Sequence, residues 1–286
     1  MSDNPLPAAA FAPLADLLGG LPLRLCDVEI NFSRPALIQR LSTATIRGLF
    51  GKLLLQMHPV AAGRLFKPGG NQPAALLFQP LHDREHRADS LHFRLISWDR
   101  EVPALAGKVL ATMAGAPFGL ADGPRVTGAC IHEVCDLQFD PVPGDLPHAI
   151  VELVTPLHIR RAHRMVTERE LDLHCMIATI VRRLNQLSIY YGNKLQLDDS
   201  EYDFLASGTV EAGRRLETEH HYRVSGVQQR PILLAGMTGR LAYEVLPAPL
   251  ADLINTASLV HIGHHTMEGC GRIALADASF SDSGSF

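Results

Sequence analysis

A glycine-rich segment near the C-terminus contains the residues of this sequence that are most suited to chemistry on a phosphate. Three glycines fall within nine residues, and two histidines and an arginine stand among them. The six residues are Gly263, His264, His265, Gly269, Gly271 and Arg272. Because glycine has no side chain, backbone N–H groups in such a loop can approach an anion closely. A tight connection that needs glycine only for its geometry would have the same composition, so both interpretations stay open at this point.

Histidines elsewhere supply further candidates for acid–base chemistry, because the pKa of imidazole lies near neutral pH. The chain has 14 histidines. His58 stands near the end of an expected helix, and His132 stands in an expected strand, where a structural role is more common. His82 and His86 lie in a charged segment that we expect to be a solvated loop. Their spacing of four residues would also suit a metal ion bound to a helix.

Arginine dominates the basic residues, since 22 of the 26 are Arg. Arg is preferred where a planar group grips phosphate or guanine or stacks on a base. A GC-rich genome raises the Arg content in the same way. The densest basic run, Arg160, Arg161 and Arg164, adjoins an expected strand and is a candidate for binding phosphate, the alternative being a solvated basic edge. The net charge of −4 argues against a generic nucleic-acid binder, which usually carries a basic surplus.

The composition fits a globular protein without a cofactor. Hydrophobic residues make up 47% and charged residues 20%, which is enough for a buried core. The five cysteines form no CxxC pair, so we expect free thiols, no disulfide framework and no metal site. No apolar run reaches the roughly 20 residues of a membrane span, and the N-terminus lacks the basic start of a signal peptide. We therefore expect a cytoplasmic protein with no membrane partner.

The elements that would position these residues appear in the same order twice, first in the N-terminal half. The expected ranges there are strand 23–32, helix 42–57, strand 74–78, strand 91–95, helix 102–113 and strand 125–139. The alternation of the first strand slips near Asp27, which predicts a bulge. Ser42 and Thr43 can cap the first helix, whose apolar residues recur at spacings of four, three and four, and Pro59 ends it.

A segment rich in Pro, Gly and Asp, residues 140–147, is typical of a linker, and the same order begins again after it. The expected ranges are strand 148–155, helix 173–191, strand 220–228, strand 239–245, helix 248–259 and strand 271–276. Each βαββαβ unit is a ferredoxin-like motif. The sequence therefore predicts an α+β protein with two tandem ferredoxin-like (RRM-like) domains. Their expected boundaries are 22–140 and 148–277, and the second domain carries the glycine-rich loop.

Four further stretches accompany the glycine-rich segment in a consistent order and spacing. They are Thr45–Gly51, Pro117–Arg125, Thr155–Arg160 and His221–Gln229. Together with the glycine-rich segment, which is the most specific of the five, they resemble the RAMP superfamily. The resemblance is specifically to the CRISPR-associated endoribonucleases that process precursor CRISPR RNA, with departures at two positions of the last stretch. It covers about residues 22–276.

The resemblance implies a metal-independent endoribonuclease that binds the CRISPR repeat hairpin and cleaves precursor CRISPR RNA. In such enzymes the 2′-hydroxyl of the RNA attacks the adjacent phosphate and leaves a cyclic phosphate. The family's catalytic histidine aligns with Ala62 or Gly63 here, neither of which can do acid–base work. His58, about one helical turn earlier, is therefore the candidate catalytic residue. The resemblance also implies that the protein retains the mature guide RNA and joins other subunits of an interference complex.

The predicted RNA-binding residues combine the basic run, the glycine-rich loop and the family pattern, which supports Arg223 and Arg272. They are Arg47, Arg160, Arg161, Arg164, Arg223, Gly263, His264, His265, Gly269, Gly271 and Arg272. The missing histidine motivates an alternative, a non-catalytic RAMP subunit that binds CRISPR RNA within an interference complex. A more distant alternative is a histidine-rich, metal-dependent hydrolase.

Overall fold

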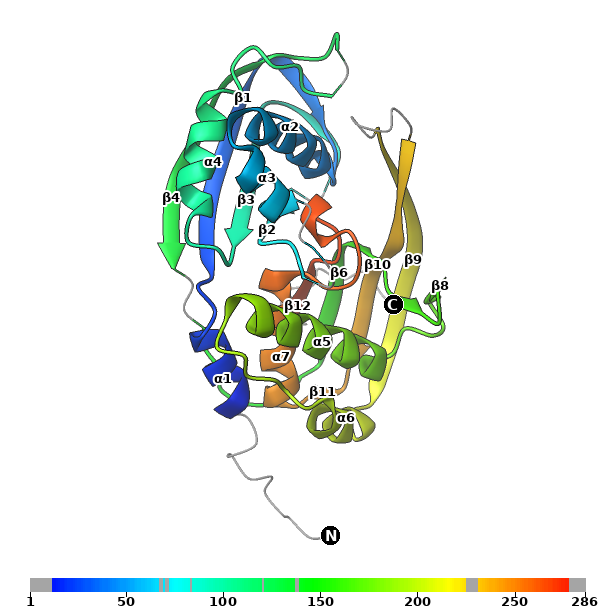
Figure 1. Cartoon of the computed structure of the whole chain (residues 1–286). Helices are drawn as coiled ribbons and strands as arrows, with labels where there is room; N and C mark the ends of the chain where they lie inside the picture. The colour runs from blue at the N-terminus through cyan, green and yellow to red at the C-terminus, as the bar shows by residue number, and fades with distance from the viewer. Residues whose placement is uncertain are drawn as a thin grey trace, which may run out of the picture.

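The chain folds into two antiparallel four-stranded sheets, each with helices on one face (Figure 1). This computed structural model describes residues 12–66, 69, 72–82, 84–119, 121–136, 139–224 and 231–277. Within those ranges, no helix combines the length and the apolar character that crossing a membrane requires. The strand orders of the two sheets confirm the predicted α+β class with two tandem ferredoxin-like folds.

The N-terminal sheet has the strand order β2-β3-β1-β4. Its strands are β1 (Arg24–Ile38), β2 (Leu76–Pro80), β3 (His86–Ser97) and β4 (Val126–Asp136). The helices of this half are α2 (Ser42–Met57), α3 (Pro59–Phe66) and α4 (Val102–Ala111). Because the first strand lies inside the sheet and the last strand at its edge, this half has the arrangement of a βαββαβ unit.

The alternation of side chains along β1 decides which face of the N-terminal sheet the helices cover. Val28 and Ile30 are buried beneath the helices, whereas Asp27 and Glu29 point to the other, open face. On the covered side, Phe50 of helix α2 packs edge-on against Phe78 of strand β2, with the ring centroids 5.5 Å apart. The pairing of β1 with β4 shifts register between Asp27 and Val28, which confirms the bulge expected near Asp27.

The C-terminal sheet repeats this arrangement with the order β12-β6-β10-β9. Its strands are β6 (Ala149–Leu157), β9 (Glu211–Val224), β10 (Pro231–Tyr243) and β12 (Ile273–Asp277). Helices α5 (Leu173–Tyr191) and α7 (Ala248–Val260) cover one face (Figure 1). The side chain of Asp172 caps α5 by accepting the N–H of Cys175 over 2.7 Å, and the helix ends at Gly192 as predicted.

Several short elements lie outside the two βαββαβ units. They are α1 (Ala12–Gly19), β5 (Leu146–Pro147), β7 (Arg160–Arg161), β8 (Arg164–Met165), α6 (Asp199–Ser207), β11 (Val245–Leu246) and the 3-10 helix η2 (Thr266–Glu268). Strand β5 pairs with β11, so the expected linker ends in a strand that is attached to the C-terminal half. The domain boundaries 22–140 and 148–277 stay a prediction.

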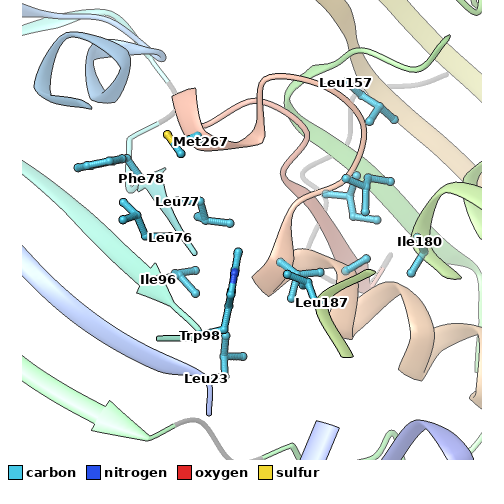
Figure 2. Close-up of a cluster of buried hydrophobic side chains, with 14 of the residues drawn as sticks. Leu23, Leu76, Leu77, Phe78, Ile96, Trp98, Leu157, Ile180, Leu187 and Met267 are labelled. Atoms are coloured by element: carbon cyan, nitrogen blue, oxygen red, sulfur yellow. The ribbon is translucent and has the colours of Figure 1, made fainter. Parts of the chain in front are cut away.

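A shared hydrophobic core joins the two halves. Figure 2 shows side chains of β2 and β3 meeting side chains of α5 and of the loop that carries Met267. Trp98, which is 1% exposed, lies at the centre of this contact and donates its indole N–H to the main-chain oxygen of Ala74 over 2.7 Å. The guanidinium of Arg183 on α5 lies 5.2 Å from the centre of the Trp98 ring. The halves are therefore fixed against each other by packing.

Three expectations about the elements differ from the structure, although helix α2 has its predicted bounds. Helix α2 has Leu41 as its N-cap without a side-chain cap, and the Ser42 hydroxyl instead accepts the N–H of Gln39 over 2.8 Å. Strand β3 begins at His86, so His86 belongs to a strand and not to a solvated loop. The second half also begins its second strand earlier than expected, at Glu211, while residues 225–228 of that expectation lie outside the described residues.

Candidate nucleic-acid interface

The glycines of the glycine-rich loop (residues 261–272) adopt backbone conformations that a side chain would oppose. Gly263, Gly269 and Gly271 have φ angles of 81°, 95° and 74°, in the left-handed region. A Cβ on Gly271 would collide with the main-chain oxygen of Ile262. A Cβ on Gly263 would lie 2.5 Å from the main-chain oxygen of His158. The tight-connection interpretation therefore holds for these glycines, because the path of the loop itself requires them.

The glycine-rich loop packs against the N-terminal half. Thr43 at the start of α2 donates its hydroxyl to the main-chain oxygen of Glu268 over 3.2 Å. One turn later, Nη1 of Arg47 lies 3.6 Å from the Glu268 carboxylate, and the Arg47 guanidinium also lies 5.5 Å from the centre of the Phe66 ring. A Cβ on Gly269 would meet the Thr43 hydroxyl at 2.7 Å. The loop and α2 therefore form one packed contact.

The last basic residue of the loop takes part in the same contact. Arg272 donates from Nη1 to the main-chain oxygen of Pro80 in β2 over 3.0 Å, and its own N–H bonds to the Thr155 hydroxyl over 2.9 Å. Burial lowers the pKa of Arg272, and the nearby charge of Arg94 lowers it further. Three predicted RNA ligands, Arg47, Gly269 and Arg272, thus lie in the junction between the halves. Their role in RNA binding stays a prediction.

The other end of the loop is open to solvent and carries a group of three imidazoles. The ring of His158, directly after β6, has His264 and His265 as neighbours, with centroid distances of 5.3 and 5.7 Å. Both pairs are edge-on. His158 is 9% exposed, whereas His264 lies on the surface. We call these three residues the histidine cluster.

The hydrogen bonds of His158 define the orientation of its ring. Nδ1 lies 2.8 Å from the main-chain oxygen of Ala235, so Nδ1 carries the proton and donates it. Nε2 lies 3.2 Å from Nε of Arg160, which donates to it. This bond holds the Arg160 guanidinium beside the cluster.

The environment of His264 favours its neutral form. Burial lowers the pKa of His264, and the charges that His158, Arg160, His265 and Arg182 can carry lower it further. A neutral imidazole at neutral pH is able to accept a proton. The surroundings of His264 are therefore those of a general base or a hydrogen-bond acceptor beside positive charge.

The predicted basic run forms the β7–β8 hairpin beside the histidine cluster. Arg160 and Arg161 are exposed on β7. Arg164 on β8 is held by the carboxylate of Glu170 through two hydrogen bonds, one of them 2.8 Å long, and this pairing lowers the pKa of Glu170 to about 2. Arg164 is therefore neutralised within the chain, whereas Arg160 and Arg161 stay available to a phosphate.

A polar network connects the start of α2 to strand β9. Arg40 lies 2.6 Å from Oε1 of Glu219, whose Oε2 lies 2.8 Å from Nε2 of His221. The Thr238 hydroxyl donates to the same carboxylate over 2.9 Å. Burial alone would raise the pKa of Glu219, but the hydrogen bonds from His221 and Thr238 hold it below its usual value. Glu219 is therefore ionised and ties the two halves together.

His58 lies away from the glycine-rich loop. It is the C-cap of α2 with φ −144°, and its main-chain oxygen accepts the N–H of Ala62 over 2.9 Å, so it also opens α3. Arg47, which touches the loop, precedes it by 11 residues, or roughly 16 Å along the helix axis. Ala62, one of the two positions that align with the family's histidine, is buried. Among the described residues, the His58 imidazole makes no hydrogen bond, and its catalytic role stays a prediction.

The remaining candidates fall at separate places. His82 contacts the main-chain oxygen of Gln39 over 2.6 Å, and its ring lies edge-on to His86 at 5.8 Å. His132 lies on β4. Arg223 is a residue of β9, but its side chain lies outside the described residues, as do residues 225–229 of the last family-like stretch. The structure therefore brings together Arg160, His264 and His265 and leaves His58 apart.

Two residues of this site were missed from the sequence. His158 precedes the basic run directly, and this adjacency was the available signal. Arg182 lies in the middle of the amphipathic helix α5, where an exposed arginine has no distinguishing pattern. Only the fold places it near His264.

Ligands for a metal ion are grouped once among the described residues, at Glu29, Cys130 and His132. This group belongs to the N-terminal sheet and not to the histidine cluster. The interface built by the cluster and the β7–β8 hairpin offers imidazoles and guanidinium groups, a donor set that suits phosphate.

Part of the chain matches a known protein family. Residues 151–273 match the family model of the CRISPR-associated endoribonuclease Cas6. A comparison with curated proteins finds no sequence match.

Solved structures with the same fold cover nearly the whole chain. A Cas6 product complex has a TM-score of 0.59 and 16% identity, with 89% of this chain and 100% of that chain covered. Thermus thermophilus Cas6 has a TM-score of 0.56 and 15% identity, covering 90% and 99%. A chain of a partial Cas6-RT-Cas1–Cas2 complex has a TM-score of 0.58 and 12% identity, covering 93% and 48%. These structures share the fold of this chain, and the family match over residues 151–273 agrees with the resemblance that the sequence motifs indicate.

Proposed function

We propose that the chain is a RAMP-type protein that binds CRISPR repeat RNA and processes precursor CRISPR RNA, because residues 151–273 match the Cas6 endoribonuclease family and solved Cas6 structures share its fold. The observation that carries this proposal is the grouping of Arg160, His264 and His265 at one open surface. These groups come from two segments about 100 residues apart in the sequence. Phosphate contacts from such residues position an RNA hairpin, while sequence is read at accessible bases.

The proposed reaction is attack of the RNA 2′-hydroxyl on the adjacent phosphate, without a metal ion. It needs a base for the 2′-hydroxyl, an acid for the leaving oxygen and a cation for the charged phosphate. Neutral His264 suits the base, and Arg160 next to it suits the cation. Each acid–base role contributes roughly 10²–10⁴-fold to the rate. His58 is the second candidate for acid–base work and is kept because it lies near the family's histidine position.

A second candidate function is binding of CRISPR RNA without cleavage, within an interference complex with other subunits. Ala62 and Gly63 at the expected catalytic position favour it, as does the separation of His58 from the glycine-rich loop. In that case the histidine cluster would contribute contacts to RNA and no proton transfer.

Cleavage of labelled repeat RNA in the presence of EDTA distinguishes these functions. Under metal-independent processing, the unmodified protein cuts the RNA at one position, and His264→Ala lowers the single-turnover rate by at least about 100-fold. The single-turnover rate of His58→Ala tests the second candidate, His58, in the same way. His174→Ala is the matched control, because this histidine pairs with Asp203 on the helical side of the C-terminal half. RNA that is bound tightly but left intact would support the binding-only function.

A further inference from the structure

Four potential metal ligands meet on the open face of the N-terminal sheet, on three adjacent strands. Glu29 is on β1, His92 on β3, and Cys130 and His132 are on β4. The ligand atoms of Glu29, Cys130 and His132 all lie within 4.8 Å of one another. Nε2 of His132 is 2.7 Å from Oε2 of Glu29, and Sγ of Cys130 is 3.6 Å from Nε2 of His132. His92 lies next to this group, with its Nε2 3.6 Å from Oε1 of Glu29.

Strand register explains why these residues converge. Glu29 stands directly opposite His92 on one side and Cys130 on the other, so the three side chains share one face in a row across the sheet. His132 is two residues from Cys130 on the same strand and therefore points to the same face. The register shift between Asp27 and Val28 falls at His132, so His132 has no partner residue on β1. Its side chain lies beside Glu29.

We propose that Glu29, His92, Cys130 and His132 form a binding site for a transition-metal ion, with Zn²⁺ as the preferred occupant. A thiolate, two imidazoles and a carboxylate are the ligands that tetrahedral Zn²⁺ takes in proteins. Bond lengths of about 2.0–2.3 Å put the ligand atoms of such a site roughly 3.3–3.8 Å apart. Two of the distances here are 3.6 Å, and the His132–Glu29 hydrogen bond has to open by less than 1 Å. His92 contacts Glu29 and has to move toward the other ligands to complete the tetrahedron.

The ligands are accessible to an ion from solvent. The side chains of His92 and His132 are 56% and 53% exposed, whereas that of Glu29 is 23% exposed and anchored between its neighbouring strands. Bound metal would link β3, β1 and β4 across the sheet. The site is separate from the proposed RNA chemistry, because α2, which ends at His58, covers the opposite face of the sheet and the histidine cluster belongs to the other half.

Metal titration of the full-length, tag-free protein tests the site. After EDTA treatment and removal of the chelator, the protein is titrated with Co²⁺, whose thiolate complex has a characteristic ultraviolet absorption band, and with Zn²⁺ in competition with a chromophoric chelator. We expect one Zn²⁺ per chain and a Co²⁺–thiolate band. Cys130→Ser should remove the band and weaken Zn²⁺ binding at least tenfold, and Glu29→Gln should weaken Zn²⁺ binding while keeping a band.

Cys135→Ser is the matched control, because Cys135 lies on the same strand and pairs with Leu25, four residues from Glu29. Zn²⁺ should raise the melting temperature of this variant and of the unmodified protein but not that of Cys130→Ser. The proposal is overturned if the unmodified protein binds no stoichiometric Zn²⁺, or if Cys130→Ser and Cys135→Ser bind it equally. Neither result bears on RNA cleavage, which is measured separately in EDTA.

Discussion

The N–H of His264 bonds over 2.8 Å to the main-chain oxygen of His158, and the imidazole rings of the two residues stand edge-on at 5.3 Å. This bond fixes the outer end of the glycine-rich loop to the end of strand β6. The loop therefore presents His264 at a constant position beside Arg160, and its glycines allow the approach. The account of RNA processing depends on this arrangement.

The pH dependence of cleavage should follow the lowered pKa of His264. As a general base, His264 acts when it is deprotonated, so the rate should fall as the pH drops through its pKa. Because that pKa lies below the ordinary value of 6.5, the acid limb of the profile should lie below pH 6.5. Arg160→Gln removes a nearby positive charge, which raises the pKa and should move the acid limb to higher pH. The measurement is the single-turnover rate against pH.

Arg100→Gln is the control for this shift, because this exposed arginine lies in the N-terminal half. An acid limb that stays at the same pH in Arg160→Gln and Arg100→Gln would contradict the role of His264 as the base.

Binding of RNA should weaken when charge is removed around the histidine cluster. Arg161→Gln and Arg182→Gln each remove one positive charge from this surface without breaking an ion pair within the described ranges. We expect repeat RNA to bind more weakly. The slope of the logarithm of the binding constant against the logarithm of the salt concentration should become shallower by about 0.7–0.9 for each phosphate that the variant no longer neutralises. Fluorescence anisotropy over a salt series measures both quantities. An unchanged slope in both variants would place the RNA elsewhere.

Gly271 should be indispensable for folding of the loop. Gly271→Ala puts a Cβ into the main-chain oxygen of Ile262 at φ 74°, so we expect a loss of at least about 2–4 kcal/mol of unfolding free energy. Gly107→Ala on α4 is the matched change, since no atom lies within 4 Å of the added Cβ. It should stabilise the protein by up to about 1 kcal/mol. Urea denaturation compares the two, and equal effects would contradict the packed loop.

Acid should destabilise the protein through His261. This imidazole is fully buried, with Nδ1 bonded to the main-chain oxygen of Cys270 over 3.0 Å. Burial lowers its pKa from 6.5 to about 3, so the unfolded chain binds a proton that the folded protein excludes between these values. Stability is therefore complete above pH 6.5 and decreases as the pH falls toward 3, by about 4–5 kcal/mol over that window.

The slope of unfolding free energy against pH measures this effect. His261→Gln should flatten the slope between pH 6.5 and 4, whatever its effect on absolute stability. His174→Gln measures what a histidine outside the core contributes to the same slope. A slope that is the same in both variants would mean that His261 is not the group responsible.

The sequence predicted both ferredoxin-like folds because their signals are local. The alternation of β1, the apolar face of α2 and the end of α5 at Gly192 depend on residues close in the sequence, and all three appear as expected. The bulge at Asp27 was also visible as a slip in the alternation. Helix α3 was missed because Pro59 ends one helix and, as the first residue of the next, favours its start.

The site was harder to predict because it depends on contacts across the chain. Arg47 and Arg272 have the residue types of phosphate ligands, yet they face Glu268 and Pro80 in the junction between the halves. Nothing in the local sequence around the two arginines specifies those partners. The convergence of Glu29, His92 and Cys130 likewise depends on strand register, and the absence of a CxxC pair led to the expectation that no metal site exists.

The most direct test of RNA processing compares two repeat RNAs that differ only by the 2′-hydroxyl at the scissile nucleotide. Both are incubated with excess full-length protein in EDTA, and their products are followed over time. The account predicts that the RNA with the hydroxyl is cut once, leaving a cyclic phosphate, while the 2′-deoxy RNA is bound and stays intact. Cleavage of both RNAs, or of neither, would contradict it.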